Sequence, residues 1–199
     1  MRLYRVIGIF GATVAYLFIA VSIAVSPWFN FYDNALSDLG NTALHGSTAW
    51  IFNTGLILSG LFEASFAILI SRQRPSWKYL IWTVPLSVAG VDLAMVGFFP
   101  ENAGRIHLLV SVILFASMSI TMFIYSYVSW TLGTPVIGAV ALTFGMASAI
   151  VWFVQWPWKG VAIQETLTSA MASILLILIC LKGNRIVFGS RNNDEEVVK

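Results

Sequence analysis

Six long apolar stretches divide this chain, and they restrict its fold more than any other feature of the sequence. They cover residues 6–28, 48–71, 79–99, 107–130, 136–156 and 163–181. Each has about the 20 residues that a helix needs to cross a hydrocarbon layer of ~30 Å. Helices satisfy all their backbone hydrogen bonds internally, which lipid demands. The sequence therefore predicts an all-α integral membrane protein, a six-transmembrane-helix bundle.

Composition supports lipid as the main solvent. Of the 199 residues, 58% are hydrophobic and 10% are charged, whereas soluble domains have roughly 25% charged residues. The net charge of +2 is small and the basic residues are scattered, so we expect no nucleic-acid partner. The single cysteine, Cys180, offers no disulfide.

The distribution of Lys and Arg predicts the orientation. Nine of the eleven fall on one side of the six spans, and only Arg105 and Lys159 fall on the other. The positive-inside rule places the nine in the cytoplasm. We therefore expect a multi-pass protein of the cell membrane with both termini cytoplasmic. Residues 1–190 would form the transmembrane domain, and residues 191–199 a disordered polar cytoplasmic tail.

The first outer loop, residues 28–47, is the longest loop and contains Asp33, Asp38 and His45. Its aromatic side chains would gain roughly 1.5–3 kcal/mol each by burial. The Ser37-Asp38 pair followed by Gly40 is typical of a turn or helix cap. We expect a short helix or structured turn near residues 34–40. It would lie across the outer face and direct Asp38 toward the second to fourth spans.

Small residues recur on one face of the third span, at positions 87, 90, 94 and 97, and of the fifth span, at positions 138, 141, 145 and 148. Such stripes let helix backbones approach closely in membranes, so both predict helix packing.

Polar residues inside the spans indicate which faces are buried. Glu63, in the inner half of the second span, shares a face with Asn53. We expect it to be neutral or paired with a buried donor, in a structural or proton-related role. Asp92 lies opposite the small stripe of the third span, which predicts a central position for that helix. Gln155 falls on the small-residue face of the fifth span and should point into the bundle.

Several polar residues have similar depths near the outer end although they come from different parts of the chain. This agreement predicts an outward-facing polar cavity. The catalytic candidates are Asp38, His107 and Glu165, and the ligand-binding candidates are Ser37, Asn53, Asp92, Glu101 and Gln155. The alternative is that these groups cap helices and pair with Arg105 and Lys159 in the wet interface.

Other chemistries have weaker sequence support. Neither His45 nor His107 belongs to a compact metal-binding motif, so we expect no metal and no cofactor. Ser37, Asp38 and His107 are residue types used by hydrolases, but the chain has no Gly-x-Ser-x-Gly elbow. A channel would need a filter sequence or a ring of like charges, and neither occurs in the sequence.

Three segments carry a family resemblance. They are Asn34-Ala35-Leu36-Ser37-Asp38-Leu39-Gly40 with Phe52-Asn53-Thr54-Gly55-Leu56, the run from Gly90 to Pro100, and His107. In these segments the chain resembles the domain-of-unknown-function 998 family of prokaryotic membrane proteins. More distantly, it is similar to the damage-regulated autophagy modulators and their GPI-remodelling relatives, also six-helix proteins. The matching positions there are Ser37, Asp38, Gly40, Phe99, His107 and Glu165, and the resemblance implies lipid handling.

Two functions follow from these observations. The first is a protein that binds or modifies lipid at the outward-facing cavity. His107 would then be the acid/base or headgroup donor, and Asp38 would orient it or bind a cationic headgroup. The second is a non-catalytic accessory subunit or interaction protein of a larger membrane complex, favoured by the minimal loops and small-residue stripes. The sequence leaves open whether the protein is an enzyme.

Overall fold

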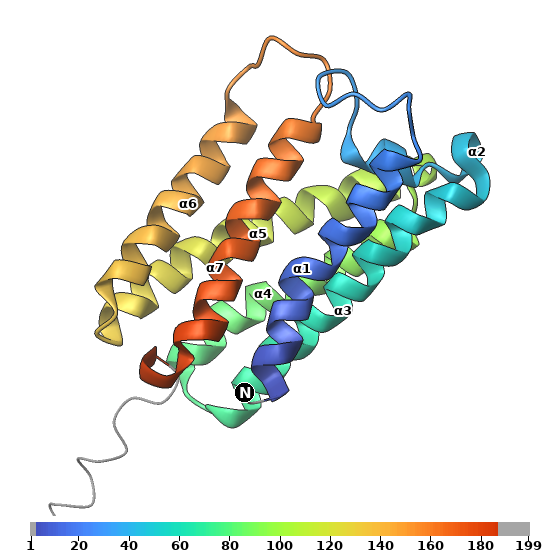
Figure 1. Cartoon of the computed structure of the whole chain (residues 1–199). Coiled ribbons are helices and arrows are strands. Elements are labelled where there is room, and N and C mark those ends of the chain that lie inside the picture. The colour runs from blue at the N-terminus through green and yellow to red at the C-terminus, as the bar shows by residue number, and fades with distance from the viewer. Residues whose placement is uncertain (1–2, 187–199) are drawn as a thin grey trace, which may run out of the picture.

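The computed structural model describes residues 3–186, and every regular element among them is helical (Figure 1). The six long helices are α1 (Leu3–Ala24), α3 (Ala49–Gln73), α4 (Trp77–Phe98), α5 (Arg105–Thr131), α6 (Pro135–Phe153) and α7 (Ala162–Ile186). Four short elements join them: η1 (Leu36–Gly40), α2 (Thr42–His45), η2 (Gly46–Thr48) and η3 (Glu101–Ala103). Within residues 3–186, six helices are long and apolar enough to cross a membrane, as predicted.

The helices follow one another around the bundle. Helix α1 packs on α3, α3 on α4, α4 on α5 and α5 on α6, and α7 closes the circuit against α1, α5 and α6. One end of the bundle holds the N-terminus and the connections α3–α4 and α5–α6 (Figure 1). The opposite end holds residues 25–48, 99–104 and 154–161, and we call it the lid end.

The small-residue stripes lie at helix interfaces. A Cβ on Gly60 of α3 would collide with the carbonyl oxygen of Gly90 in α4, and a Cβ on Gly90 would lie 2.6 Å from the Ala64 backbone nitrogen. On α6, Ser148 is buried and lies 3.2 Å from the Ser119 hydroxyl of α5. Both stripes therefore allow close backbone approach, which is the packing role predicted for them.

Two helices end earlier than expected. Helix α1 ends at Ala24 instead of residue 28, because Pro27 disfavours helical backbone in the residue before it. Helix α6 ends at Phe153, and Val154 is already extended. The Trp156 indole donates to the Val151 carbonyl at 2.8 Å and satisfies the last turn from outside.

The prediction that the third span, α4, is central is wrong. Its main neighbours are α3 and α5, and Val84, Val88 and Val91 are exposed on its outer face. Asp92 is nevertheless buried, as expected, since α4 has protein on two sides.

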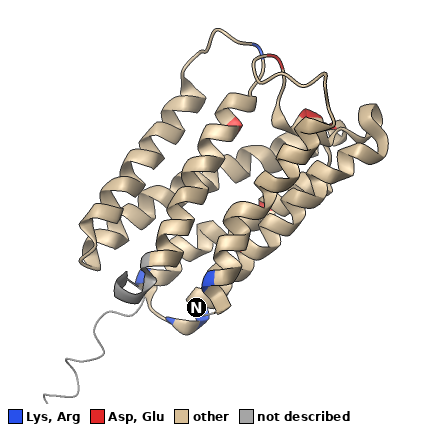
Figure 2. Ribbon diagram, in the orientation of Figure 1, with Lys and Arg blue, Asp and Glu red and all other residues tan. Residues whose placement is uncertain are grey.

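Charge is distributed unequally between the two ends of the described chain. Figure 2 shows most of the Lys and Arg at the end with the N-terminus and one basic segment in a loop of the lid end, whereas Asp and Glu are concentrated toward the lid end. The exceptions are Lys159 and Arg105, which lie in and beside the lid-end connections, and Glu63, which is buried within α3. The predicted disordered tail, residues 191–199, lies outside the described residues.

Candidate functional site

Residues 34–41, which we call the lid, fold into the end of the bundle. Leu36, Ser37, Leu39 and Gly40 are buried, and η1 is the short helix predicted near residues 34–40. The reason given for its burial was wrong, however. Tyr32 is 60% exposed, and Trp28 and Phe31 are exposed as well. The two leucines of η1 are buried in the core, and of the loop aromatics only Phe29, which is partly buried, packs against it among the described residues.

Three hydrogen bonds hold the lid to the helices. Asn53 Nδ2, from α3, donates to the Gly40 carbonyl at 3.0 Å. The Leu36 N–H donates to Glu165 Oε2 of α7 at 2.5 Å, and the Ala162 N–H donates to the Asn34 carbonyl at 3.0 Å. The lid thus connects α3 with α7 across the top of the bundle.

Only glycine fits at position 40, because the lid lies very close to α3 there. A Cβ there would collide with Asn53 Oδ1 and lie 2.9 Å from the Phe52 ring. The close approach lets the Gly40 carbonyl reach the buried Asn53 amide. This contact gives a physical reason why Gly40 and Asn53 occur together in the two motifs that contain them.

Asp38 closes the start of η1. Its Oδ2 accepts hydrogen bonds from Asn34 Nδ2 and from the Ala35 N–H, both at 3.0 Å. The carboxylate is therefore fixed in orientation, and it lines a cavity under the lid. That cavity is bounded by α5, α6 and α7, so Asp38 does not face the second to fourth spans as a group. Only the fourth span, α5, matches the expectation.

The cavity, which we call the lateral cavity, has a volume of about 700 Å³. Its roof holds five of the predicted site residues: Ser37, Asp38, Glu101, His107 and Glu165. Its walls are largely apolar and include Leu108, Val112, Phe115, Ile120, Trp152 and Phe153. Val112 and Phe153 are also exposed at the outside of the bundle. The lateral cavity therefore opens through the side of the helix bundle, between α5 and α6.

His107 has a defined tautomer in this setting. Its Nδ1 lies 2.8 Å from the Phe99 carbonyl oxygen, which can only accept, so Nδ1 carries the proton. Nε2 is then the acceptor of the neutral ring. Because His107 lines the lateral cavity, the ring is oriented for proton exchange with a bound group, which is the arrangement that general bases use.

The two glutamates of the roof are held by lid residues. Glu101 Oε2 accepts a hydrogen bond from Asn41 Nδ2, and Glu165 Oε2 accepts from the Leu36 N–H. No ion pair connects either glutamate to Arg105 or Lys159 in the described part of the chain. Both glutamates are therefore held by neutral donors of the lid.

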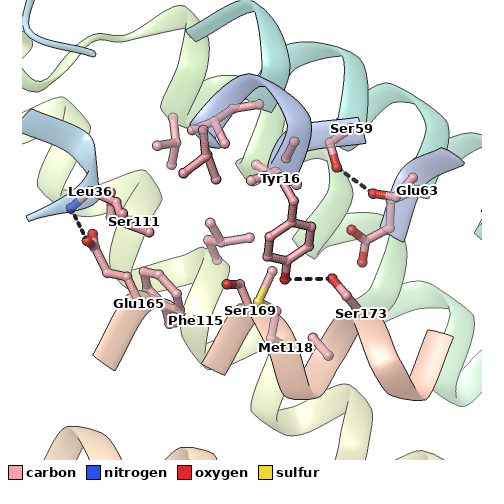
Figure 3. A pocket seen from close by; sticks show the side chains of 18 of the residues that line it. Tyr16, Leu36, Ser59, Glu63, Ser111, Phe115, Met118, Glu165, Ser169 and Ser173 are labelled. Carbon is pink, nitrogen blue, oxygen red and sulfur yellow. Dashed lines mark hydrogen bonds between the residues drawn. The ribbon is translucent and has the colours of Figure 1, made fainter. Parts of the chain in front are cut away.

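A second, smaller cavity lies deeper, and we call it the inner cavity. Its volume is about 80 Å³, and Ser37, Ser111, Phe115 and Glu165 line both cavities. Figure 3 shows Glu165 toward one side of the inner cavity and Glu63 toward the other, with Tyr16 between them. The Tyr16 hydroxyl donates to Ser173 Oγ at 3.0 Å.

Three predicted site residues lie elsewhere. Asn53 is buried under the lid, where it holds Gly40 in place. Asp92 is buried in α4 with Oδ2 lacking a partner among the described residues, and it lines neither the lateral nor the inner cavity. The expectation that Gln155 points into the bundle is wrong. It is exposed, because α6 ends two residues earlier at Phe153.

Sequence reasoning missed the lower part of the site. Ser111 and Ser119 of α5 line the lateral cavity, and Ser169 and Ser173 line the inner cavity. The spacing Glu165, Ser169, Ser173 repeats every four residues along one helical face, which was a detectable signal. In residues 3–186 no three His, Cys, Asp or Glu side chains are grouped closely enough to hold a metal ion.

The described part of the chain is a bundle of six helices, each long enough to span a membrane, with polar groups at one end. This architecture is that of a multi-pass membrane protein. Within this class the chain belongs to the family described as "Protein of unknown function (DUF998)", whose model matches residues 9–182. The resemblance to this family that the sequence motifs indicated is thereby confirmed. No curated protein and no solved structure matches the chain.

Proposed function

We propose that the protein spans the cell membrane with both termini in the cytoplasm and the lid end outside. The support is the charge distribution, since Arg5 near the start of α1, Arg72 and Arg74 at the end of α3, and Lys78 at the start of α4 lie at the end opposite the lid. Basic residues near span ends are retained on the cytoplasmic side. In this orientation the lateral cavity opens into the outer leaflet.

We further propose that the lateral cavity binds a membrane lipid. The observation that carries this proposal is the combination of an apolar wall, a polar roof and a sideways opening in one space of about 700 Å³. Ligand sites commonly occupy ~300–1,000 Å³, with mostly apolar walls and a few oriented polar groups. An acyl chain would lie along α5 and α6, and the headgroup would lie beneath the lid.

The roof favours a headgroup rich in hydrogen-bond donors. Its titratable groups are Asp38, Glu101, His107 and Glu165, and no Lys or Arg of residues 3–186 lines the cavity. A headgroup with net negative charge would be repelled by these acids. Amine or hydroxyl groups would instead donate to the carboxylates. His107 Nε2 would accept a proton from such a group, so any chemistry at the site would start with deprotonation of the headgroup.

The distant resemblance to the autophagy modulators and their GPI-remodelling relatives involves Ser37, Asp38, His107 and Glu165, all of which line this cavity. That resemblance agrees with lipid handling and remains a prediction. Catalysis is a separate question from binding, and the substitution His107→Asn addresses it. Asparagine retains a donor near the Phe99 carbonyl and removes Nε2, so lipid binding should persist while any turnover stops.

Native mass spectrometry after mild detergent extraction tests the binding proposal. Ala149 lines the lateral cavity, whereas its neighbour Ile150 does not line it and is 53% exposed. We expect wild type and Ile150→Trp to retain one lipid, and Ala149→Trp to lose it because the indole fills the cavity. Equal lipid retention by both variants would refute the proposal. Stoichiometric recovery of another membrane protein in place of lipid would favour the accessory-subunit function.

A further inference from the structure

Glu63 is an ionisable side chain that is buried within α3. It is 6% exposed, lies within α3, and has no hydrogen-bond partner in the described part of the chain. Its side chain lines the inner cavity. A carboxylate without a partner at this depth is costly in a membrane, and such residues commonly mark proton or ion pathways.

Among the described residues, no Lys, Arg or His lines the inner cavity around Glu63. Helix α1 contributes Tyr16 and α7 contributes Glu165 to the inner cavity, and these are the other titratable groups that line it. From α4 and α5 the cavity receives apolar side chains and Ser111. The chemistry of the site therefore suits a proton on Glu63 better than a bound anion.

Side chains with hydroxyl groups lie along α7 between the level of Glu165 and the level of Glu63. Ser169 and Ser173 lie four and eight residues after Glu165 on the same face of α7, which is a descent of about 12 Å. Both line the inner cavity, and Ser173 accepts the hydrogen bond of Tyr16. The cavity volume of about 80 Å³ admits roughly five water molecules. Waters and hydroxyls together can form a continuous hydrogen-bonded chain along this path.

The route beyond Glu63 is nearly closed. A small cavity of about 20 Å³ continues from Glu63 toward the other end of the bundle. It is lined mostly by apolar side chains, including Leu86, Met122 and Ile179. Space for roughly one water does not make a proton path. The access to Glu63 is thus one-sided.

We propose that Glu63 is a reversible proton-binding site, supplied from the lateral cavity by a chain of water and hydroxyl groups through Glu165, Ser169 and Ser173. The site takes up a proton from the lid end and holds it within the bundle, without conducting it to the opposite side. This proposal is independent of lipid binding, because the inner cavity is too small for a lipid.

Infrared difference spectroscopy of the full chain in liposomes tests the site directly. Wild-type protein should show a protonated-carboxyl band that disappears as the pH rises. The band should be absent in Glu63→Gln and shifted but present in Glu63→Asp, which also controls for folding. A wild-type spectrum from which Glu63→Gln removes no titrating component would overturn the proposal. Displacement of the titration by Na⁺ would overturn it as well, by indicating a metal-cation site.

The route is tested by the rate at which the Glu63 band shifts when H₂O is replaced by D₂O. Ser169→Leu narrows the inner cavity and should slow the exchange several-fold. Leu167→Phe is the matched control on the same helix, because Leu167 is 45% exposed and does not line the cavity. Exchange that is equally fast in wild type and both variants would contradict a route along this face of α7.

Discussion

Replacement of Asn53 by leucine should loosen the lid while leaving the helix bundle folded. Asn53 is 1% exposed, and its amide donates to the Gly40 carbonyl at 3.0 Å. Leucine has a similar volume but cannot donate. A buried polar group that loses its partner costs about 1–3 kcal/mol. Because the loss falls on the lid, the equilibrium constant for lid opening should rise by roughly 5- to 150-fold.

Amide hydrogen exchange followed by mass spectrometry measures this equilibrium. Peptides covering residues 34–41 should exchange faster in Asn53→Leu by the factor given above, and peptides from α4 and α5 should be unchanged. Thr54→Leu is the control, since Thr54 is the next residue of α3 and is exposed. Unchanged exchange in residues 34–41 would show that the Asn53 bond does not hold the lid. Faster exchange throughout the bundle would show that Asn53 stabilises the whole fold instead.

Three further changes have defined outcomes. Gly60→Leu should lower stability by about 1–3 kcal/mol in thermal melts, because the new side chain would collide with the Gly90 carbonyl. Leu61→Ala, at an exposed site of the same helix, should cost far less. Equal losses in the two variants would refute the close contact between α3 and α4. Glu165→Leu should expose the Leu36 N–H and accelerate its exchange, whereas Glu165→Gln keeps an acceptor and should resemble wild type; identical exchange in both variants would argue against this bond. If Glu63 holds a proton as proposed, Glu63→Gln should change the unfolding free energy by less than about 1 kcal/mol, because the amide is uncharged and has the same shape. A large loss would show that the charge itself is required.

The number of helices was predictable because hydrophobic length is a strong signal. Lipid permits few backbone arrangements, so a run of about 20 apolar residues indicates a span with little ambiguity. The helix ends were less predictable. The Trp156 indole bond to the Val151 carbonyl, which closes α6, is a tertiary contact with no local sequence signal.

The candidate site was predicted only in part, because the sequence indicates how far along a span a residue lies but not which helices are neighbours. Polar residues near the ends of spans have a depth that the sequence fixes, so Asp38, His107 and Glu165 were correctly expected at one end. Which helices approach one another is a property of packing, and this placed Asn53 under the lid and left Asp92 outside the cavities. Gln155 was misplaced because one helix end was misjudged.

The lid contains aromatic and aliphatic residues, and the sequence analysis did not distinguish which of the two would be buried. Aromatic residues of a membrane-surface loop are satisfied at the interface, so Tyr32 remains exposed. Leu36 and Leu39 have no such alternative and are buried. The aliphatic positions of a short loop helix are therefore better indicators of docking than the aromatic ones beside them.

A density map of the protein in lipid nanodiscs, at a resolution that shows lipid, tests the central claim most directly. The nanodiscs should contain lipids with hydroxyl-bearing, amine-bearing and anionic headgroups. We predict one ordered acyl chain beside Val112 and Phe153, between α5 and α6, with a donor-bearing headgroup next to Asp38 and His107. A lateral cavity that is filled by water alone, or a lipid bound with its headgroup away from the lid, would contradict the proposed function.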